Sequence, residues 1–205
     1  MNGVRRTRLA VMASGTGTNF LAIAAAAREG RLLVEIPVLI CDKPGAKALT
    51  LASRLGIDSV CVSPKEFESR EAMDAAILEV LQERDVELVA LAGYMRIIGQ
   101  PLLDAYQGRI VNIHPSLLPH FPGVGAIEET YVGGHGGVTV HLIDEGVDTG
   151  PILAQQPVHR FGTDTLETFE ARVHRVEHAL YPGVLQALID ERRTEAEERS
   201  TGAAK

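Results

Sequence analysis

Short apolar segments rich in β-branched residues alternate with helical segments along most of this chain, and this alternation restricts its possible folds most strongly. The pattern predicts strands at residues 7–13, 34–41, 59–62, 87–92, 108–114, 137–143 and 151–159. It predicts helices at residues 20–29, 46–55, 69–84 and 165–189, with Pro182 and Gly183 favouring a bend in the last one. Because such alternation is typical of α/β proteins, we expect a Rossmann-like, mostly parallel twisted sheet with helices on both faces.

The size and composition of the chain predict one domain followed by a short tail. The 205 residues are 45% hydrophobic, which is sufficient for a full core over residues 1–189. Residues 190–205 mix Arg, Glu, Ser and Gly, and we expect them to be frayed or disordered. The formal net charge of −7 argues against nucleic-acid and membrane partners. We expect a monomer or homodimer that acts on small-molecule substrates.

The cysteines and the N-terminal segment predict a cytoplasmic protein. Cys41 and Cys61 fall in expected strands without the spacing of a metal site, so we expect buried free thiols in a reducing compartment. The apolar run at residues 9–13 is shorter than the core of a signal peptide. No apolar segment approaches the length of a transmembrane helix.

The strand expected to end at His114 carries polar side chains that are suited to chemistry. Asn112 lies two residues before His114, so both side chains leave the same face of the sheet, and Pro115 ends the strand. Ligands of open α/β sheets bind at the carboxyl ends of the strands. Asp148, in a glycine-flanked loop, would add an orienting carboxylate to the amide and the imidazole. We therefore predict that Asn112, His114 and Asp148 are catalytic.

A glycine-rich turn after the first expected strand predicts an anion site. Gly15 and Gly17 precede a helix, but Phe20 stands where the dinucleotide-binding fingerprint has its third glycine. The backbone amides of Gly17, Thr18 and Asn19 at the helix N-terminus could still bind one phosphate. We expect a side chain at position 17 to occupy the space of that phosphate. The alternative is a purely structural turn in which Thr18 or Asn19 caps the helix.

The histidines besides His114 give no reason to expect a metal site. They lack a recognisable ligand spacing, and no cysteine lies near them in the sequence. We predict a protein without a metal, with packed or solvent-facing side chains at His135, His141, His159, His174 and His178.

Five motifs occur in the order seen in the folate-dependent formyltransferases. They are Ser14-Gly15-x-Gly17-x-Asn19, Leu91 to Ile98, Asn112-Ile113-His114-Pro115-Ser116-Leu117-Leu118-Pro119, Asp148 to Ile152, and Glu177-His178-x-x-Tyr181-Pro182. The chain resembles this family over about residues 7–189. The proline after His114 and the glycine-rich first turn are most similar to its phosphoribosylglycinamide formyltransferase branch.

The resemblance implies a reaction and a set of binding residues. It implies transfer of a formyl group from 10-formyltetrahydrofolate to the amine of phosphoribosylglycinamide in purine biosynthesis, through a tetrahedral oxyanion. Asn112 and His114 would stabilise the oxyanion, while Asp148 would orient His114 and move a proton through a water. The resemblance also implies a phosphate and ribose site at Gly15, Gly17, Thr18, Asn19 and Glu177, and folate contacts at Arg70, Met95, Arg96, Ile97, Ile98, Asn112 and Val147.

Residues just beyond the catalytic run depart from the family pattern, at positions expected near the acceptor. Gly125 stands where members often carry histidine, Glu128 and Glu129 stand where a basic residue is common, and His120 replaces a lysine or a small residue. These departures leave open a paralogue that formylates another small amine or a hydrazine. A nicotinamide-dependent dehydrogenase, with Asp42 binding a ribose, and an inactive folate- or nucleotide-binding module are two further possibilities.

Overall fold

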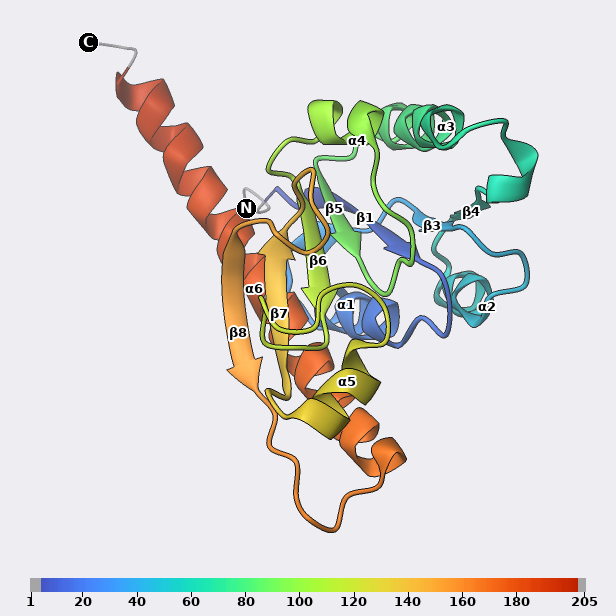
Figure 1. The fold of residues 1–205 in the computed structure, drawn as a ribbon. Coiled ribbons are helices and arrows are strands. Elements are labelled where there is room, and N and C mark those ends of the chain that lie inside the picture. The colour runs from blue at the N-terminus through green and yellow to red at the C-terminus, as the bar shows by residue number, and fades with distance from the viewer. Residues whose placement is uncertain (1–4, 203–205) are drawn as a thin grey trace.

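The computed structural model describes residues 5–202, with residues 1–4 and 203–205 outside the described part (Figure 1). The strands are β1 (Thr7–Ala13), β2 (Val34–Glu35), β3 (Leu39–Cys41), β4 (Ser59–Cys61), β5 (Leu88–Leu91), β6 (Ile110–His114), β7 (Gly137–Leu142) and β8 (Ile152–Pro157). The helices are α1 (Thr18–Arg28), α2 (Lys47–Leu55), α3 (Arg70–Glu83), α4 (Gln100–Ala105), α5 (Ala126–Gly133) and α6 (Leu166–Gly202), with a 3-10 turn at Pro64–Glu66.

The strands form one sheet in the order β4-β3-β1-β5-β6-β7-β8, and β2 pairs with β1 beside that path. Along the sheet, β4, β3, β1, β5 and β6 run parallel to one another. Strand β7 runs antiparallel to both β6 and β8. This arrangement confirms the predicted mostly parallel α/β sheet. The carboxyl ends of β1, β5 and β6 lie side by side, so the loops that follow these strands meet at one edge of the sheet.

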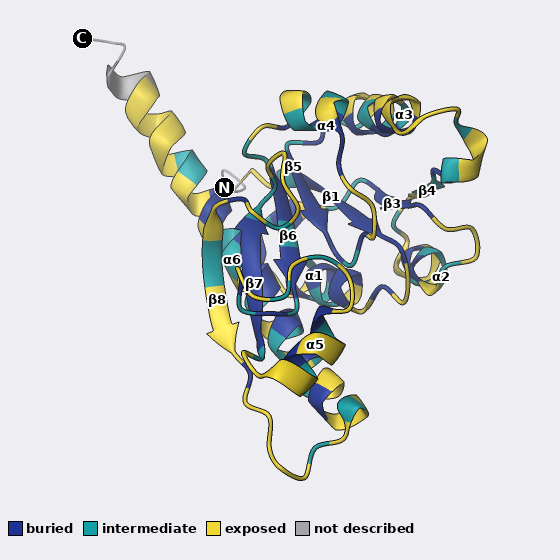
Figure 2. Cartoon of the chain, in the orientation of Figure 1, coloured by how far each residue is buried: buried dark blue, intermediate teal, exposed yellow. Residues whose placement is uncertain are grey.

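The two faces of the sheet carry separate apolar cores, which confirms the prediction of helices on both faces. Leu9, Val11 and Ala13 of β1 belong to the core that contains α1 and α6. Ala10 and Met12 point the other way, into the core that contains α3 and α4. Figure 2 shows the buried strands enclosed between these layers of helices.

Local elements differ from the prediction where the sequence pattern is short or interrupted. Residues 34–41 form the two short strands β2 and β3, because Pro37 between them cannot donate a ladder hydrogen bond. Helices α4 and α5 do not appear in the prediction, since their six and eight residues are too few to establish a helical period.

Helix α6 extends past the predicted end of the domain. Residues 190–202 are helical where the prediction has a frayed or disordered tail, and the last residues of that predicted tail, 203–205, lie outside the described part of the chain. The guanidinium of Arg192 donates to the Gly108 carbonyl oxygen, which ties the helix to the start of β6. The Glu, Arg and Ala residues of this stretch are strong helix formers, a preference that outweighs its polarity. Among the described residues, no helix is both long and apolar enough to cross a membrane.

Tyr181 fixes α6 against the sheet behind the carboxyl ends of β5 and β6. Its buried hydroxyl lies 3.1 Å from the Leu91 carbonyl oxygen and 2.8 Å from the Val111 carbonyl oxygen. The helix remains continuous through Pro182. Glu177 lies one turn before Tyr181 on the same side of α6, so this attachment also directs Glu177 toward the edge of the sheet where the loops meet.

Candidate active site

A cavity of about 330 Å³ opens at the carboxyl ends of β5 and β6. Asn112 and His114, at the end of β6, line this cavity together. Asp148 reaches the same wall from the loop that joins β7 to β8. The structure thus brings together the three residues that the sequence predicts to be catalytic.

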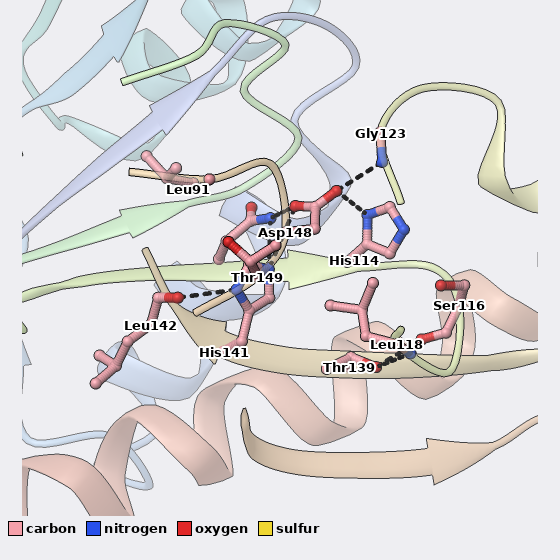
Figure 3. A network of polar contacts seen from close by, with 12 residues as sticks. Leu91, His114, Ser116, Leu118, Gly123, Thr139, His141, Leu142, Asp148 and Thr149 are labelled. Atoms are coloured by element: carbon pink, nitrogen blue, oxygen red, sulfur yellow. Dashed lines mark hydrogen bonds and ion pairs between the residues drawn. The ribbon is translucent and has the colours of Figure 1, made fainter. Parts of the chain in front are cut away.

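Asp148 is the centre of the polar network in Figure 3. Its Oδ2 accepts a hydrogen bond from the backbone N–H of Gly123 at 2.7 Å and lies 3.3 Å from Nδ1 of His114. Its Oδ1 lies 3.4 Å from Nδ2 of Asn112 and 3.4 Å from Nε2 of His141. Burial alone would raise the pKa of this carboxyl, but the hydrogen bonds from His141 and Gly123 and the charge of His114 lower it. Asp148 is therefore held as a carboxylate.

His141 also belongs to this network. The sequence predicts only a packed or solvent-facing side chain at this position and gives it no part in the site. It lies directly opposite Asn112 in the antiparallel pairing of β6 with β7, and it is completely buried. Its Nε2 lies 3.1 Å from Nδ2 of Asn112, and its Nδ1 lies 2.9 Å from the Leu142 carbonyl oxygen. Only the pairing of the two strands brings His141 to the site, and sequence spacing alone does not reveal that pairing.

Both histidines have oxygen atoms beside both of their ring nitrogens. Nε2 of His114 lies 2.7 Å from the Phe121 carbonyl oxygen, while its Nδ1 faces Asp148. The Leu142 carbonyl and Asp148 flank His141 in the same way. A doubly protonated ring donates to both oxygens, whereas a neutral ring leaves one lone pair facing an oxygen. Both nitrogens of His114 thus face oxygen atoms that accept N–H hydrogen bonds, whereas Nε2 of His141 also faces the Asn112 amide nitrogen at 3.1 Å.

A second cavity, of about 290 Å³, lies between the glycine-rich turn after β1 and helix α6. The residues predicted to bind a phosphate and a ribose all line it, namely Gly15, Gly17, Thr18, Asn19 and Glu177. The two cavities share part of their wall, formed by Gly93, Met95, Ile113, Pro115 and Ile127. They are therefore adjacent parts of one cleft, on either side of the end of β6.

Polar groups of α1 and α6 meet in this second cavity. Nδ2 of Asn19 donates to Oε2 of Glu177 at 3.1 Å, and the buried Oδ1 of Asn19 has no hydrogen-bond partner. His174 also lines the cavity, and its Nδ1 lies 2.7 Å from the same oxygen of Glu177. The sequence prediction misses His174, although its spacing of three residues from Glu177 places both on one side of a helix.

Gly17 has a steric role that differs from the predicted one. Its φ is +76°, and a Cβ at this position would lie 2.9 Å from the Cα and Cβ atoms of Ala48 in α2. The absence of a side chain therefore makes room for α2, while the expectation that it also keeps space for a phosphate stays a prediction.

We expect Gly17→Ala to lower the free energy of unfolding by about 2 kcal/mol, because it combines an unfavourable left-handed conformation with overpacking against Ala48. Denaturant unfolding followed by circular dichroism measures this change. Gly15→Ala is the matched control, since a Cβ at Gly15 meets no atom within 4 Å. Equal unfolding free energies for the two variants would contradict the steric role of Gly17.

Several residues predicted to bind folate expose apolar side chains around the larger cavity. Met95 and Ile97 are 57% and 56% exposed, and Val147, which lines the same cavity, is 50% exposed. Ile98 also lines the cavity but is buried in the core beneath it. Exposed apolar groups that gather at a concave site are typical of a surface that binds an apolar ring.

The two arginines predicted to contact folate lie in different places. Arg96 lines the cavity, and its Nε donates to Oδ2 of the buried Asp42 at 2.8 Å. Asp42, the carboxylate that a dehydrogenase would need for a ribose, is thus buried and paired with Arg96 through one of its oxygens. Arg70 begins α3 with a side chain that is 52% exposed, and it is not among the described residues that line the cavity. Its contact with a folate tail stays a prediction.

The departures from the family pattern lie at the start of α5. Gly125 has a φ of +83°, a conformation that disfavours the histidine often found there. Gly125 and Glu128 line the larger cavity and not the second one, and their expected position near the acceptor stays a prediction. The His120 ring stacks on His135, with centroids 4.0 Å apart. Within residues 5–202, no group of three or more His, Cys, Asp or Glu side chains is arranged to hold a metal ion.

Comparison with known proteins identifies the family of this chain. The model of the formyl transferase family matches residues 7–185, which include every element from β1 into the first half of α6. The chain therefore belongs to the formyl transferase family.

Similar proteins narrow the comparison further. The chain is 48% identical over 184 residues to phosphoribosylglycinamide formyltransferase of Bacillus subtilis, with 89% of this chain and 94% of that protein covered. It is 40% identical over 190 residues to the trifunctional purine biosynthetic protein adenosine-3 of Drosophila melanogaster, and this match covers 91% of the chain but only 14% of that larger protein. The crystal structure of glycinamide ribonucleotide transformylase 1 from Geobacillus kaustophilus superposes with a TM-score of 0.87 at 50% identity, covering 90% and 99% of the two chains.

Proposed function

We propose that this protein transfers a formyl group from 10-formyltetrahydrofolate to the amine of phosphoribosylglycinamide, a step of purine biosynthesis. The observation that carries the proposal is the shared wall of the two cavities. A folate in the larger cavity and a phosphorylated acceptor in the second one would meet beside Asn112 and His114 at the end of β6. Both substrates are small molecules, and the reaction needs no nucleophilic side chain.

The chemistry begins when the acceptor amine attacks the formyl carbon. A carbon–nitrogen bond forms, and the formyl oxygen becomes an oxyanion. The bond between the formyl carbon and the folate nitrogen N10 then breaks, N10 takes up a proton, and the amine loses one. The barrier falls if groups near the oxyanion already carry positive charge or N–H donors before the attack.

The residues at the end of β6 would supply this stabilisation. The Asn112 amide nitrogen carries two N–H groups and lies 3.4 Å from Asp148 Oδ1 and 3.1 Å from His141 Nε2, and one of these N–H groups would donate to the oxyanion. His114 would act through the positive charge of its ring, because Asp148 and the Phe121 carbonyl hold its two nitrogens. The Asp148 carboxylate would keep that charge in place and, through a water, pass the amine proton toward N10.

The glycine-rich turn supports a phosphorylated acceptor. The backbone amides at the start of α1 would bind the phosphate, and Glu177 would contact the ribose hydroxyls. A paralogue that formylates an unphosphorylated amine or a hydrazine would have no use for this second cavity. A dehydrogenase would need Asp42, which Arg96 already holds.

Steady-state formation of tetrahydrofolate, followed by absorbance, tests the proposal. We expect rapid turnover with phosphoribosylglycinamide and slow turnover with the unphosphorylated riboside or with hydrazine. Omission of every acceptor sets the background rate of donor hydrolysis. Equal rates with the ribotide and the riboside would contradict the phosphate site, and turnover only with hydrazine would favour the paralogue.

A further inference from the structure

His114, Thr139 and Gln155 form one row across three neighbouring strands of the sheet. Thr139 lies directly opposite His114 in the antiparallel pairing of β6 with β7, and Gln155 lies directly opposite Thr139 in that of β7 with β8. Side chains that lie opposite each other in an antiparallel pair leave the same face of the sheet. Neither Thr139 nor Gln155 is among the described residues that line the two cavities of the cleft. The row therefore joins His114 to the outer strand through two residues that are set back from the proposed substrates.

The Thr139 hydroxyl is hydrogen-bonded to the chain segment that follows His114. It donates to the Ser116 carbonyl oxygen at 2.6 Å and accepts from the backbone N–H of Leu118 at 3.1 Å (Figure 3). The side-chain amide of Gln155 donates to the same hydroxyl and to the Leu118 carbonyl oxygen, at 2.9 Å in each case. A hydroxyl has one donor and two acceptor positions, so all three positions of Thr139 are used. Because Thr139 is completely buried, the loss of these bonds would leave polar groups unpaired away from water.

The segment that begins at Ser116 ends at the carbonyl group that faces His114. Nε2 of His114 lies 2.7 Å from the Phe121 carbonyl oxygen. Phe121 has a φ of +52°, in the left-handed region that favours glycine, so the surrounding structure has to hold its backbone there. The Ser116 hydroxyl closes the segment by donating to the His120 carbonyl oxygen at 2.5 Å. Because Thr139 anchors the start of the segment, it also limits where the Phe121 carbonyl can point.

We propose that Gln155 and Thr139 are positioning residues, which hold the segment after His114 so that the Phe121 carbonyl oxygen stays on Nε2 of His114. With Nε2 held there, the ring keeps its other nitrogen, Nδ1, toward Asp148 at 3.3 Å. This inference rests on the proposed role of His114 in formyl transfer and adds two residues that act only through it. An imidazole that turns away from either oxygen would spend less time in the arrangement that stabilises the oxyanion.

Two substitutions at Thr139 test the hydroxyl by steady-state kinetics. Thr139→Val keeps the branched shape but has no hydroxyl, whereas Thr139→Ser keeps the hydroxyl. We expect Thr139→Val to lower kcat by about tenfold or more, because a small displacement of a group at the reacting centre slows the chemical step. Thr139→Ser should restore kcat to near the parent value. The Michaelis constants for phosphoribosylglycinamide and for the formyl donor should stay near those of the parent, because Thr139 is set back from both cavities.

A substitution on the outer strand tests the amide of Gln155 at a position where the fold tolerates change more easily. Gln155 is exposed, and Gln155→Glu keeps its size while a carboxylate cannot donate to Leu118 or Thr139. We expect kcat to fall by about tenfold, again with little change in either Michaelis constant. Gln156→Glu is the matched control, since it places the same charge on the next exposed residue of β8, which leaves the opposite face of the strand. It should keep the parent kcat, and an equal kcat in Gln155→Glu would overturn the proposal.

A spectroscopic measurement tests the same contact without catalysis. The histidine rings are labelled with nitrogen-15, and the His114 signals are assigned from their absence in His114→Gln. We expect the parent and Thr139→Ser to show a proton on Nε2 that is protected from exchange by its hydrogen bond to a carbonyl oxygen.

The proton on Nε2 should lose this protection in Thr139→Val and in Gln155→Glu, and if Thr139→Val does not fold, Gln155→Glu decides by the same signal and by kcat. Persistence of the protected signal in the folded variants, or its absence from the parent, would overturn the proposal. Absence of formylation in the parent, with the His114 signal changing as expected, would instead overturn the proposed function.

Discussion

Asp148→Asn is expected to reduce turnover by about 100-fold or more while the protein stays folded. The Asp148 carboxylate accepts a hydrogen bond from the backbone N–H of Gly123 and faces side-chain nitrogen atoms of His114, Asn112 and His141. An asparagine would turn an NH₂ group toward some of these nitrogens and would carry no charge to hold a protonated imidazole. It also could not take up the amine proton. Single-turnover rates with both substrates saturating would measure the loss at the chemical step.

The control for this variant lies in the same loop. Glu145→Gln removes an exposed carboxylate three residues before Asp148 and should keep the parent rate. Circular dichroism and thermal unfolding establish that both variants retain the fold. A rate for Asp148→Asn within a few-fold of the parent would remove Asp148 from the chemistry.

Asn112→Ala and His114→Ala are each expected to lower turnover by about 100-fold or more. The loss of one group that stabilises an oxyanion typically costs about 3 kcal/mol of transition-state stabilisation. Because both groups would act on the same charge, the double variant should lose less than the sum of the two free energies. Turnover rates of the parent, the two single variants and the double variant complete a double-mutant cycle. The affinity for the formyl donor should change much less than the turnover rate.

Strict additivity in that cycle would count against a shared oxyanion. It would leave Asn112 and His114 as independent contributors, for example one that holds the folate and one that orders the loop at Phe121. A large loss of donor affinity in Asn112→Ala would point in the same direction.

The sequence predicts the fold best where a single physical pattern decides it. The prediction gives the bounds of β1 correctly, because a short run of apolar residues ends at the polar turn that begins with Ser14. Helix α2 ends at Leu55, the predicted end of that helix, and Gly56 follows it in the left-handed conformation. The short helices α4 and α5 are missed because they are too short to establish a helical period. The length of α6 is missed because the polarity of residues 190–202 hides their helix preference and their contact between Arg192 and Gly108.

The candidate site shows a similar limit. Asn112 and His114 follow from the two-residue period of a strand, and Asp148 follows from its loop and from the family resemblance. His141 depends on the pairing of β7 with β6, which no local pattern specifies. His174 depends on α6 lying against the turn after β1, a contact that joins distant parts of the chain.

The most direct test of formyl transfer follows the formyl carbon itself. The donor is prepared with carbon-13 in its formyl group and incubated with the protein and phosphoribosylglycinamide, and the products are separated and measured by NMR and mass spectrometry. We predict that the label appears in the new amide of the ribotide, in an amount equal to the tetrahydrofolate formed. Label released as formate, with the ribotide unchanged, would contradict the account.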